Sequence, residues 1–273
     1  MRRLLRQPEL QSMTSLQFLL GALSGVAVGF TLGLVGGGGS ILAVPLMVYL
    51  VGVQNPHLAI GTSALAVAAN ALIGLTNHAR KHNVKWRCAS AFATAGVVGA
   101  WFGAMLGKAM DGQRLLALFA LLMLAVAGMM VRSRGREGDP SVIFNRSNAP
   151  KLLGSGAATG LLSGFFGIGG GFLVVPGLIA STGMPILFAV GSSLVAVAAF
   201  GLTTAVSYAS SGLVAWSLAG VFIGGGAIGS LFGARLAARL AHRNGVLNLV
   251  LAGLIVVVAF YMLFRAASAF GWL

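Results

Sequence analysis

Acidic side chains are scarce in this chain, and so is charge in general. Its 273 residues include 4 Asp plus Glu against 18 Lys plus Arg, and charged residues make up 8% of the total. In soluble domains, charged residues make up roughly 25% of the total. Hydrophobic residues reach 58%. The shortage of charge excludes an ordinary soluble domain and predicts a chain whose solvent is a lipid bilayer.

The few acidic residues also stay out of the apolar segments. Glu9 lies in the N-terminal tail, and Asp111, Glu137 and Asp139 lie in expected loops. No Lys or Arg occupies the centre of an apolar segment either. A cation pathway usually needs carboxylates within the membrane. The pattern therefore favours an anion that neutral groups hold, and it predicts no metal site.

Cysteine and histidine are also few. Cys88 is the only cysteine in the sequence, so no internal disulfide can form. An intramembrane serine hydrolase could use Ser63 or Ser193 with His78 as its base. His78, however, borders a basic loop, and the other three histidines fall in expected loops. We therefore expect no enzymatic activity and no cofactor, and keep the hydrolase as an alternative.

Long apolar runs divide the chain into helical segments. They cover residues 16–35, 58–75, 88–106, 115–131, 186–206, 217–232 and 246–264. Most approach the roughly 17–25 residues that a spanning helix needs. The first run follows three arginines, as in a signal peptide, but it is too long for one, so we expect it to be retained. The sequence predicts an all-α polytopic membrane protein with about 8 to 10 helical segments, including a glycine-broken short helix in each half.

A glycine cluster occurs twice. Residues 36–45 read GGGGSILAVP, and residues 167–176 read GIGGGFLVVP, at a shift of 131 positions. The match resumes at a shift of 130, pairing Gly61 with Gly191 and Trp86 with Trp216. A duplication of this length with glycine breaks at equivalent places is typical of a two-repeat transporter whose site lies near the midplane.

The duplication defines the expected domains. Residues 1–15 form a tail, 16–131 the first membrane repeat, 132–151 a cytoplasmic linker and 152–273 the second membrane repeat.

The cations lie in short clusters between the apolar runs. This pattern is typical of cytoplasmic loops under the positive-inside bias, so the net charge of +14 does not indicate nucleic acid. A parallel arrangement of the repeats would place 13 cations inside and 5 outside, and an inverted one 12 and 6. Around Trp86 lie four cations, whereas around Trp216 there are none. That contrast favours inverted repeats with both termini outside.

The glycine clusters are the first candidates for binding. Where a helix breaks and restarts, at Ser40 and at Phe172, it presents backbone N–H groups and the positive end of its dipole, which suit an anion. Unpaired backbone inside a membrane must be buried in protein or line a wet cavity. The alternative is close packing of small residues between helices. The candidate binding residues are Gly37, Gly38, Gly39, Ser40, Gly169, Gly170 and Gly171.

Polar side chains add five candidates. Thr62 and Ser63 follow Gly61, and Ser192 and Ser193 follow Gly191. The alternative is that each hydroxyl bonds its own helix backbone. Asn70 is harder to explain by packing, because its amide lies in an apolar segment and its repeat equivalent is Phe200.

These motifs resemble the TauE/SafE family, the 4-toluene sulfonate uptake permeases. The resemblance rests on the doubled Gly-x-Gly-Gly-Gly-x-x-x-x-Pro pattern, with Gly-Thr-Ser at 61–63 and Gly-Ser-Ser at 191–193, and covers roughly residues 20–265. The first copy departs from the pattern at Gly37 and Ser40.

The resemblance implies a multi-pass secondary transporter of the bacterial inner membrane. It implies a small sulfur-containing anion as substrate, such as sulfite or an organosulfonate, for example sulfoacetate. The expected partners are this anion and the lipid bilayer, with no nucleic acid. A homodimer and a passive anion channel both stay open.

Overall fold

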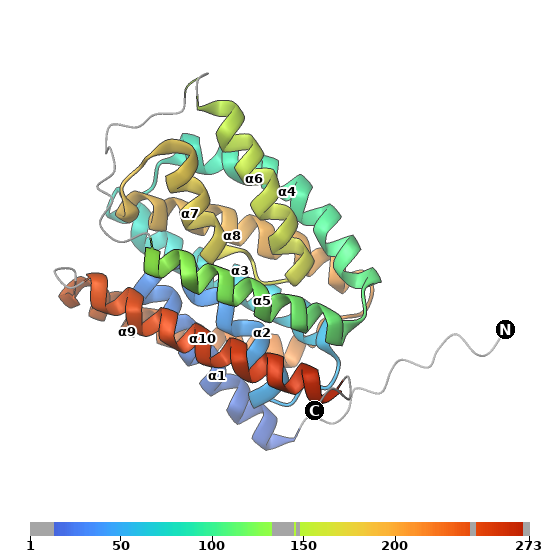
Figure 1. Ribbon diagram of the computed structural model, residues 1–273. Helices are drawn as coiled ribbons and strands as arrows, with labels where there is room; N and C mark the ends of the chain where they lie inside the picture. The colour runs from blue at the N-terminus through green and yellow to red at the C-terminus, as the bar shows by residue number, and fades with distance from the viewer. Residues whose placement is uncertain (1–13, 133–144, 146–147, 241–243, 270–273) are drawn as a thin grey trace.

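A computed structural model describes residues 14–132, 145, 148–240 and 244–269 (Figure 1). Within these ranges all regular structure is helical, which confirms the predicted all-α membrane fold. The elements are α1 (Ser15–Val35), η1 (Gly36–Leu42), α2 (Ala43–Pro45), η2 (Leu46–Leu50), α3 (Pro56–Arg80), α4 (Trp86–Ala109), α5 (Gly112–Arg132), α6 (Ala149–Phe166), α7 (Gly171–Thr182), α8 (Ile186–Ala209), α9 (Trp216–Leu240) and α10 (Asn244–Ala269). Most of the predicted tail and linker, and with them Glu9, Glu137, Asp139 and His242, lies outside the described residues.

Six of the described helices are long and apolar enough to cross a membrane. They are α1, α3, α4, α5, α8 and α9, and each overlaps an apolar run seen in the sequence. The sequence did not single out α6, whose residues include Gly154, Gly156, Gly160 and Gly164 together with hydroxyl side chains. Small and hydroxyl residues lower its apolar character, although they are the residues that let helices approach closely.

The duplication is visible in the order of the elements. The series α1, α3, α4, α5 of the first half returns as α6, α8, α9, α10, and each half has a break after its first helix. The main packing contacts cross between the halves: α1 packs on α9, α6 on α4, α3 on α8 and α5 on α10. Figure 1 shows the α4–α6 and α5–α10 pairs side by side. The two halves are therefore interlocked rather than adjacent.

The equivalent helices α3 and α8 run antiparallel. A Cβ at Gly61, near the start of α3, would lie 2.8 Å from the Tyr208 Cβ near the end of α8. A Cβ at Gly201 would lie 3.1 Å from the Ala68 Cβ, and one at Gly191 would lie 3.3 Å from Nδ1 of His78. Antiparallel packing of equivalent helices is the arrangement that inverted repeats require.

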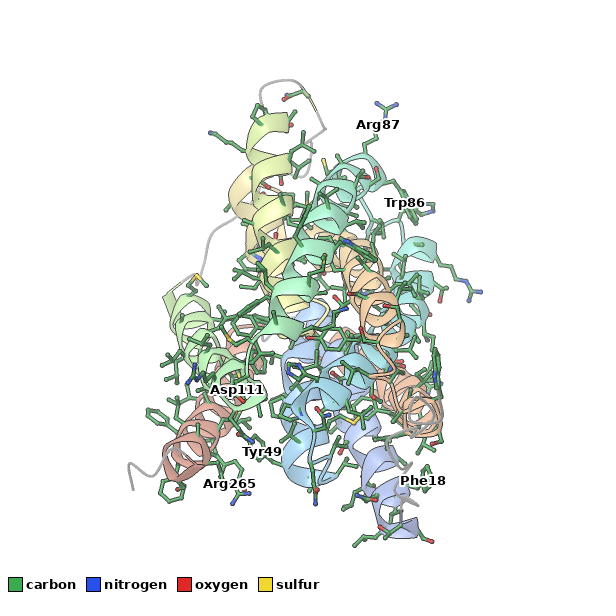
Figure 2. All side chains as sticks on the ribbon, turned by 90° about the vertical axis from the view of Figure 1, so that its right-hand side faces the viewer. Phe18, Tyr49, Trp86, Arg87, Asp111 and Arg265 are labelled. Atoms are coloured by element: carbon green, nitrogen blue, oxygen red, sulfur yellow. The ribbon has the colours of Figure 1, made fainter. Side chains whose placement is uncertain are left out.

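The two ends of the α3–α8 pair carry different loops. The loop before Trp86 lies at one end, since Asn83 contacts Gly191, and the loop before Trp216 lies at the other, since Leu213 contacts Gly61. We name these the Lys85 end and the Lys108 end. In Figure 2, Trp86 and Arg87 lie at the top, at the Lys85 end, whereas Phe18 and Arg265, near the two ends of the described chain, lie at the bottom.

Glycine stripes bring two helix pairs into backbone contact. In the α4–α6 pair, Gly156, Gly160 and Gly164 face the carbonyl oxygens of Phe92, Gly96 and Ala100 in turn. A Cβ at Gly156 would lie 2.6 Å from the Phe92 carbonyl oxygen. In the α1–α9 pair, a Cβ at Gly33 would lie 2.5 Å from the Ser230 carbonyl oxygen. Contacts this close permit Cα–H···O bonds and dispersion between backbones. For these glycines, close packing is the explanation.

His82 is held in a backbone conformation that favours glycine. Its φ is 55°, and its repeat equivalent, Gly212, has a φ of 71°. The left-handed conformation costs a residue with a Cβ about 1–2 kcal/mol, whereas the greater flexibility of glycine when unfolded costs roughly 0.5–1 kcal/mol. We expect His82→Gly to raise the unfolding free energy by about 1 kcal/mol or less, measured by thermal unfolding in detergent. His82→Ala is the control, because it removes the ring but keeps the Cβ, and an equal gain from it would contradict the backbone explanation.

Candidate functional site

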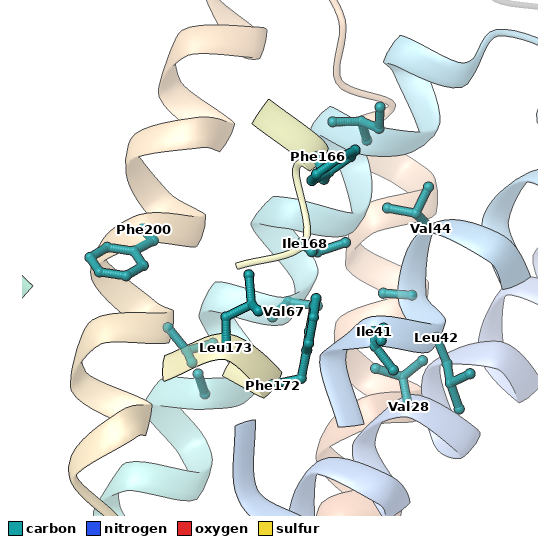
Figure 3. Close-up of a cluster of buried hydrophobic side chains, with 14 of the residues drawn as sticks. Val28, Ile41, Leu42, Val44, Val67, Phe166, Ile168, Phe172, Leu173 and Phe200 are labelled. Carbon is teal, nitrogen blue, oxygen red and sulfur yellow. The ribbon is translucent and has the colours of Figure 1, made fainter. Parts of the chain in front are cut away.

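The two glycine breaks meet in the middle of the molecule. Residues of η1 contact both α7 and α8. Figure 3 shows Ile41 and Leu42 from the first break on one side of Ile168 and Phe172 from the second, and Val67 of α3 on the other side. All five side chains are buried.

The second break is a turn built on left-handed glycines. Helix α6 ends at Phe166, and Gly167, Gly169 and Gly170 have φ values of 67°, 64° and 67°. A Cβ at Gly169 would lie 2.9 Å from Cγ1 of Val67 and 3.4 Å from Cγ1 of Val197, which are mid-helix positions of α3 and α8. The turn therefore lies at the centre of the α3–α8 pair.

Helix α7 begins beside a buried hydroxyl group that has no hydrogen-bond partner. Gly170 is its N-cap residue, with a carbonyl that accepts from the N–H groups of Leu173 (2.8 Å) and Val174 (2.9 Å). The N–H groups of Gly171 and Phe172, which come before these two, have no acceptor within their own helix. A Cβ at Gly170 would lie 2.8 Å from Oγ of Ser163, a fully buried residue of α6 whose hydroxyl is unpartnered. Helix start and hydroxyl together offer several donors to one ligand.

Ser163 is missing from the sequence-based candidates. Its repeat equivalent at the shift of 131 is Leu32. The same signal that singled out Asn70, a polar residue where the other half is apolar, could have found it.

The first break has a different geometry. Its chain continues as a 3₁₀-helix from Gly36 to Leu42, then α2, then a π-helical turn in η2. The predicted helix restart at Ser40 is wrong, because Ser40 lies inside the 3₁₀-helix and the α-helical turn starts at Ala43. In a 3₁₀-helix the N–H groups donate to carbonyls three residues back. The N–H groups of this break are therefore engaged within the helix, unlike those at the start of a new helix. Gly37, Gly38 and Gly39 are part of this winding.

Two candidate hydroxyls hold loops of the opposite half. Thr62 Oγ1 accepts from the N–H of Ala215 (3.0 Å), and Ser192 Oγ accepts from the N–H of Lys85 (2.9 Å). Thr62 and Ser192 are repeat equivalents, as are Ala215 and Lys85. Thr62 thus fixes the residue that precedes α9, and Ser192 fixes the residue that precedes α4.

The other two hydroxyls bond their own helices. Ser63 Oγ donates to the carbonyl of Ile60 (3.0 Å), and Ser193 Oγ donates to that of Val190 (2.8 Å). A hydroxyl that donates its proton to a carbonyl can only accept from a ligand. In this conformation neither serine donates to an anion, and neither uses His78 as a base.

Asn70 is fully buried, and neither its amide nitrogen nor its amide oxygen has a hydrogen-bond partner. Its side chain packs on Gly226 of α9, as its equivalent Phe200 packs on Gly96 of α4. An unsatisfied buried group costs about 1–3 kcal/mol. Phenylalanine fills the equivalent space without this cost, so packing alone does not explain an amide here.

Comparison with known proteins places this chain in a family. The family model described as Sulfite exporter TauE/SafE matches residues 21–262. The chain is 49% identical over 246 residues to a "Probable membrane transporter protein" of Xylella fastidiosa, covering 89% of this chain and 94% of that one. A "Probable membrane transporter protein" of Bacillus subtilis is 25% identical over 253 residues, or 85% and 93% of the two chains.

No solved structure matches the chain. The family match covers both repeats and both glycine breaks, which confirms the resemblance seen in the motifs. This chain is a membrane transporter that belongs to the sulfite exporter TauE/SafE family.

Proposed function

We propose that this protein is a secondary transporter of a small sulfur oxyanion or organosulfonate in a bacterial inner membrane. The observation that carries the proposal is the buried hydroxyl of Ser163, unpartnered beside the start of α7. The N–H groups of Gly171 and Phe172 at the start of α7 and this hydroxyl hold the anion, and Asn70 contributes its amide. Ser63 and Ser193 join the site only if their hydroxyls rotate away from their helix carbonyls.

The charge distribution supports an anion as substrate. Asp111 is the one acidic residue in the described part of the chain; it is exposed and precedes α5. The start of a helix carries about half a positive charge, which attracts an anion without the strong hold of a buried lysine. Neutral donors also let the anion leave again, as a transporter requires.

The orientation follows from the loops at the two ends. Arg80, Lys81, Lys85 and Arg87 gather at the Lys85 end, whereas the loop before Trp216 carries no cation. The positive-inside bias assigns the Lys85 end to the cytoplasm. The repeats are then inverted across the membrane, and both termini lie outside.

Sulfite flux into proteoliposomes tests the proposal. We expect saturable uptake of labelled sulfite that unlabelled sulfite on the opposite side accelerates, since a carrier exchanges its substrate and a passive channel does not. Ser163→Ala and Asn70→Leu should each raise the half-saturation concentration between twofold and a hundredfold, corresponding to roughly 0.5–3 kcal/mol per lost hydrogen bond. Ser155→Ala is the matched control, because this α6 hydroxyl already donates to the carbonyl of Leu152.

Two outcomes would contradict the proposal. One is saturable binding of a divalent metal with no response to sulfite or short sulfonates. The other is a Ser163→Ala variant whose half-saturation concentration equals that of the parent.

A further inference from the structure

A second polar cluster lies at the Lys108 end, away from the glycine breaks. Tyr208 of α8, His57 of α3 and Lys108 of α4 form it, and we call it the Lys108 cluster. The rings of His57 and Tyr208 are 6.3 Å apart between centroids. Tyr208 is fully buried, yet its hydroxyl has no hydrogen-bond partner, and the buried Nδ1 of His57 has none either.

Lys108 is fixed beside these two rings. Its Nζ donates to the carbonyl of Ser207 (2.8 Å) and to Oγ of Ser211 (3.2 Å), and lies 5.8 Å from the centroid of the Tyr208 ring. A Cβ at Gly107 would lie 3.3 Å from the Tyr208 hydroxyl oxygen, so this hydroxyl lies against α4 next to Lys108. Two of the three ammonium protons have acceptors, which positions the charge without neutralising it.

Neighbouring groups fix His57 and engage the one acidic side chain that the structure describes. His57 lies in the first turn of α3, where Asn55 caps the helix by accepting from the His57 N–H (3.0 Å). The exposed Asp111 is occupied in capping α5, since its Oδ1 accepts from the Arg114 N–H (3.1 Å). A fixed ammonium, an unpartnered hydroxyl and an imidazole together suit a small oxyanion.

The other half keeps a polar ring at the same position. The repeat equivalent of Tyr208 is His78, whose buried Nδ1 is also unpartnered. Each side chain lies against the equivalent glycine of the opposite half, His78 through its Nδ1 against Gly191 and Tyr208 through its Cβ against Gly61. A polar ring with an unsatisfied atom at both equivalent positions argues against an accident of packing.

We propose that Lys108, Tyr208 and His57 form a second binding site, which takes a small oxyanion at the Lys108 end. The ammonium and the Tyr208 hydroxyl donate to two oxygens of the anion, and His57 supplies a third contact through Nδ1. This site is separate from the start of α7. It does not depend on which anion the protein transports.

Sulfate binding to the purified protein in detergent tests the proposal, with chloride as the background anion. Binding is followed by titration calorimetry and by the near-ultraviolet difference spectrum of tyrosine, which changes when a hydroxyl gains an anionic acceptor. We expect Lys108→Met to weaken sulfate binding tenfold or more and Lys108→Arg to restore most of it. Tyr208→Phe keeps the ring and its packing, and should abolish the tyrosine difference signal.

The control is Arg114→Met, which removes an exposed cation close in sequence to Lys108 and outside the cluster. Unchanged sulfate affinity in both Lys108→Met and Tyr208→Phe would overturn the proposal, as would an equal loss in Arg114→Met. The central site is tested separately. Absence of transport of any sulfur anion would contradict the proposed transport function alone. A tyrosine signal that persists in Ser163→Ala would still support anion binding at the Lys108 cluster.

Discussion

Gly160→Leu is expected to leave almost no folded protein. Gly160 of α6 faces the backbone of Gly96 in α4, and a Cβ there would lie 2.5 Å from the Gly96 Cα. Neither backbone can yield locally, so a leucine would force the two helices apart along their whole contact. Destabilisation of about 4 kcal/mol or more lowers the ratio of folded to unfolded protein roughly a thousandfold.

A fluorescent fusion analysed by size-exclusion chromatography in detergent measures the effect. Gly154→Leu is the matched control: it lies in the same helix, and a Cβ there would meet nothing within 4 Å. We expect the Gly154 variant to elute as the parent does and the Gly160 variant to be lost or aggregated. A monodisperse Gly160→Leu protein at parental yield would show that α4 and α6 do not touch through their backbones.

Gly170→Ala should abolish most transport while the protein still inserts and folds. At a φ of 67° the alanine costs about 1–3 kcal/mol. Its methyl group would lie 2.6 Å from the Cβ and 2.8 Å from Oγ of Ser163. The hydroxyl that we assign to the anion must therefore move. We expect sulfite flux at low sulfite concentration to fall at least tenfold.

Gly183→Ala separates the clash from the backbone strain. Gly183 ends α7 with a φ of 76°, but a Cβ there would meet nothing within 4 Å. The two variants share the strained conformation, and only Gly170→Ala crowds Ser163. We expect Gly183→Ala to keep near-parental flux per folded molecule. Normal flux in Gly170→Ala would instead assign the second break to packing alone.

The periodicity and duplication of the sequence were sufficient to predict the helical architecture. The runs 58–75 and 186–206 became α3 and α8, because long apolar stretches in a bilayer leave the backbone few alternatives to helix. The glycine pattern also indicated where the second half breaks. Helix α6 was not predicted, because its many small residues make it only weakly apolar and because its packing partner α4 is remote in sequence.

The chemistry of the candidate site was harder to predict. Thr62 and Ser192 each follow a glycine, which suits a ligand-binding hydroxyl, yet they accept from loop N–H groups that lie 153 and 107 residues away in sequence. A contact over such a separation has no local signature. The predicted helix restart at Ser40 was wrong for a different reason. The four consecutive glycines and the serine that follows them wind into a 3₁₀-helix, whereas in the second cluster Ile168 interrupts the run of glycines.

The exchange of partners between the halves has a consequence for biosynthesis. Helix α1 packs on α9, about 200 residues later in the chain. At about 5–20 residues per second, α1 emerges roughly 10–40 s before its partner exists. During that interval its glycine face has only lipid or the insertion machinery beside it. Folding of this protein therefore has to be largely post-translational, and a chain truncated before α9 should be a substrate for membrane quality-control proteases.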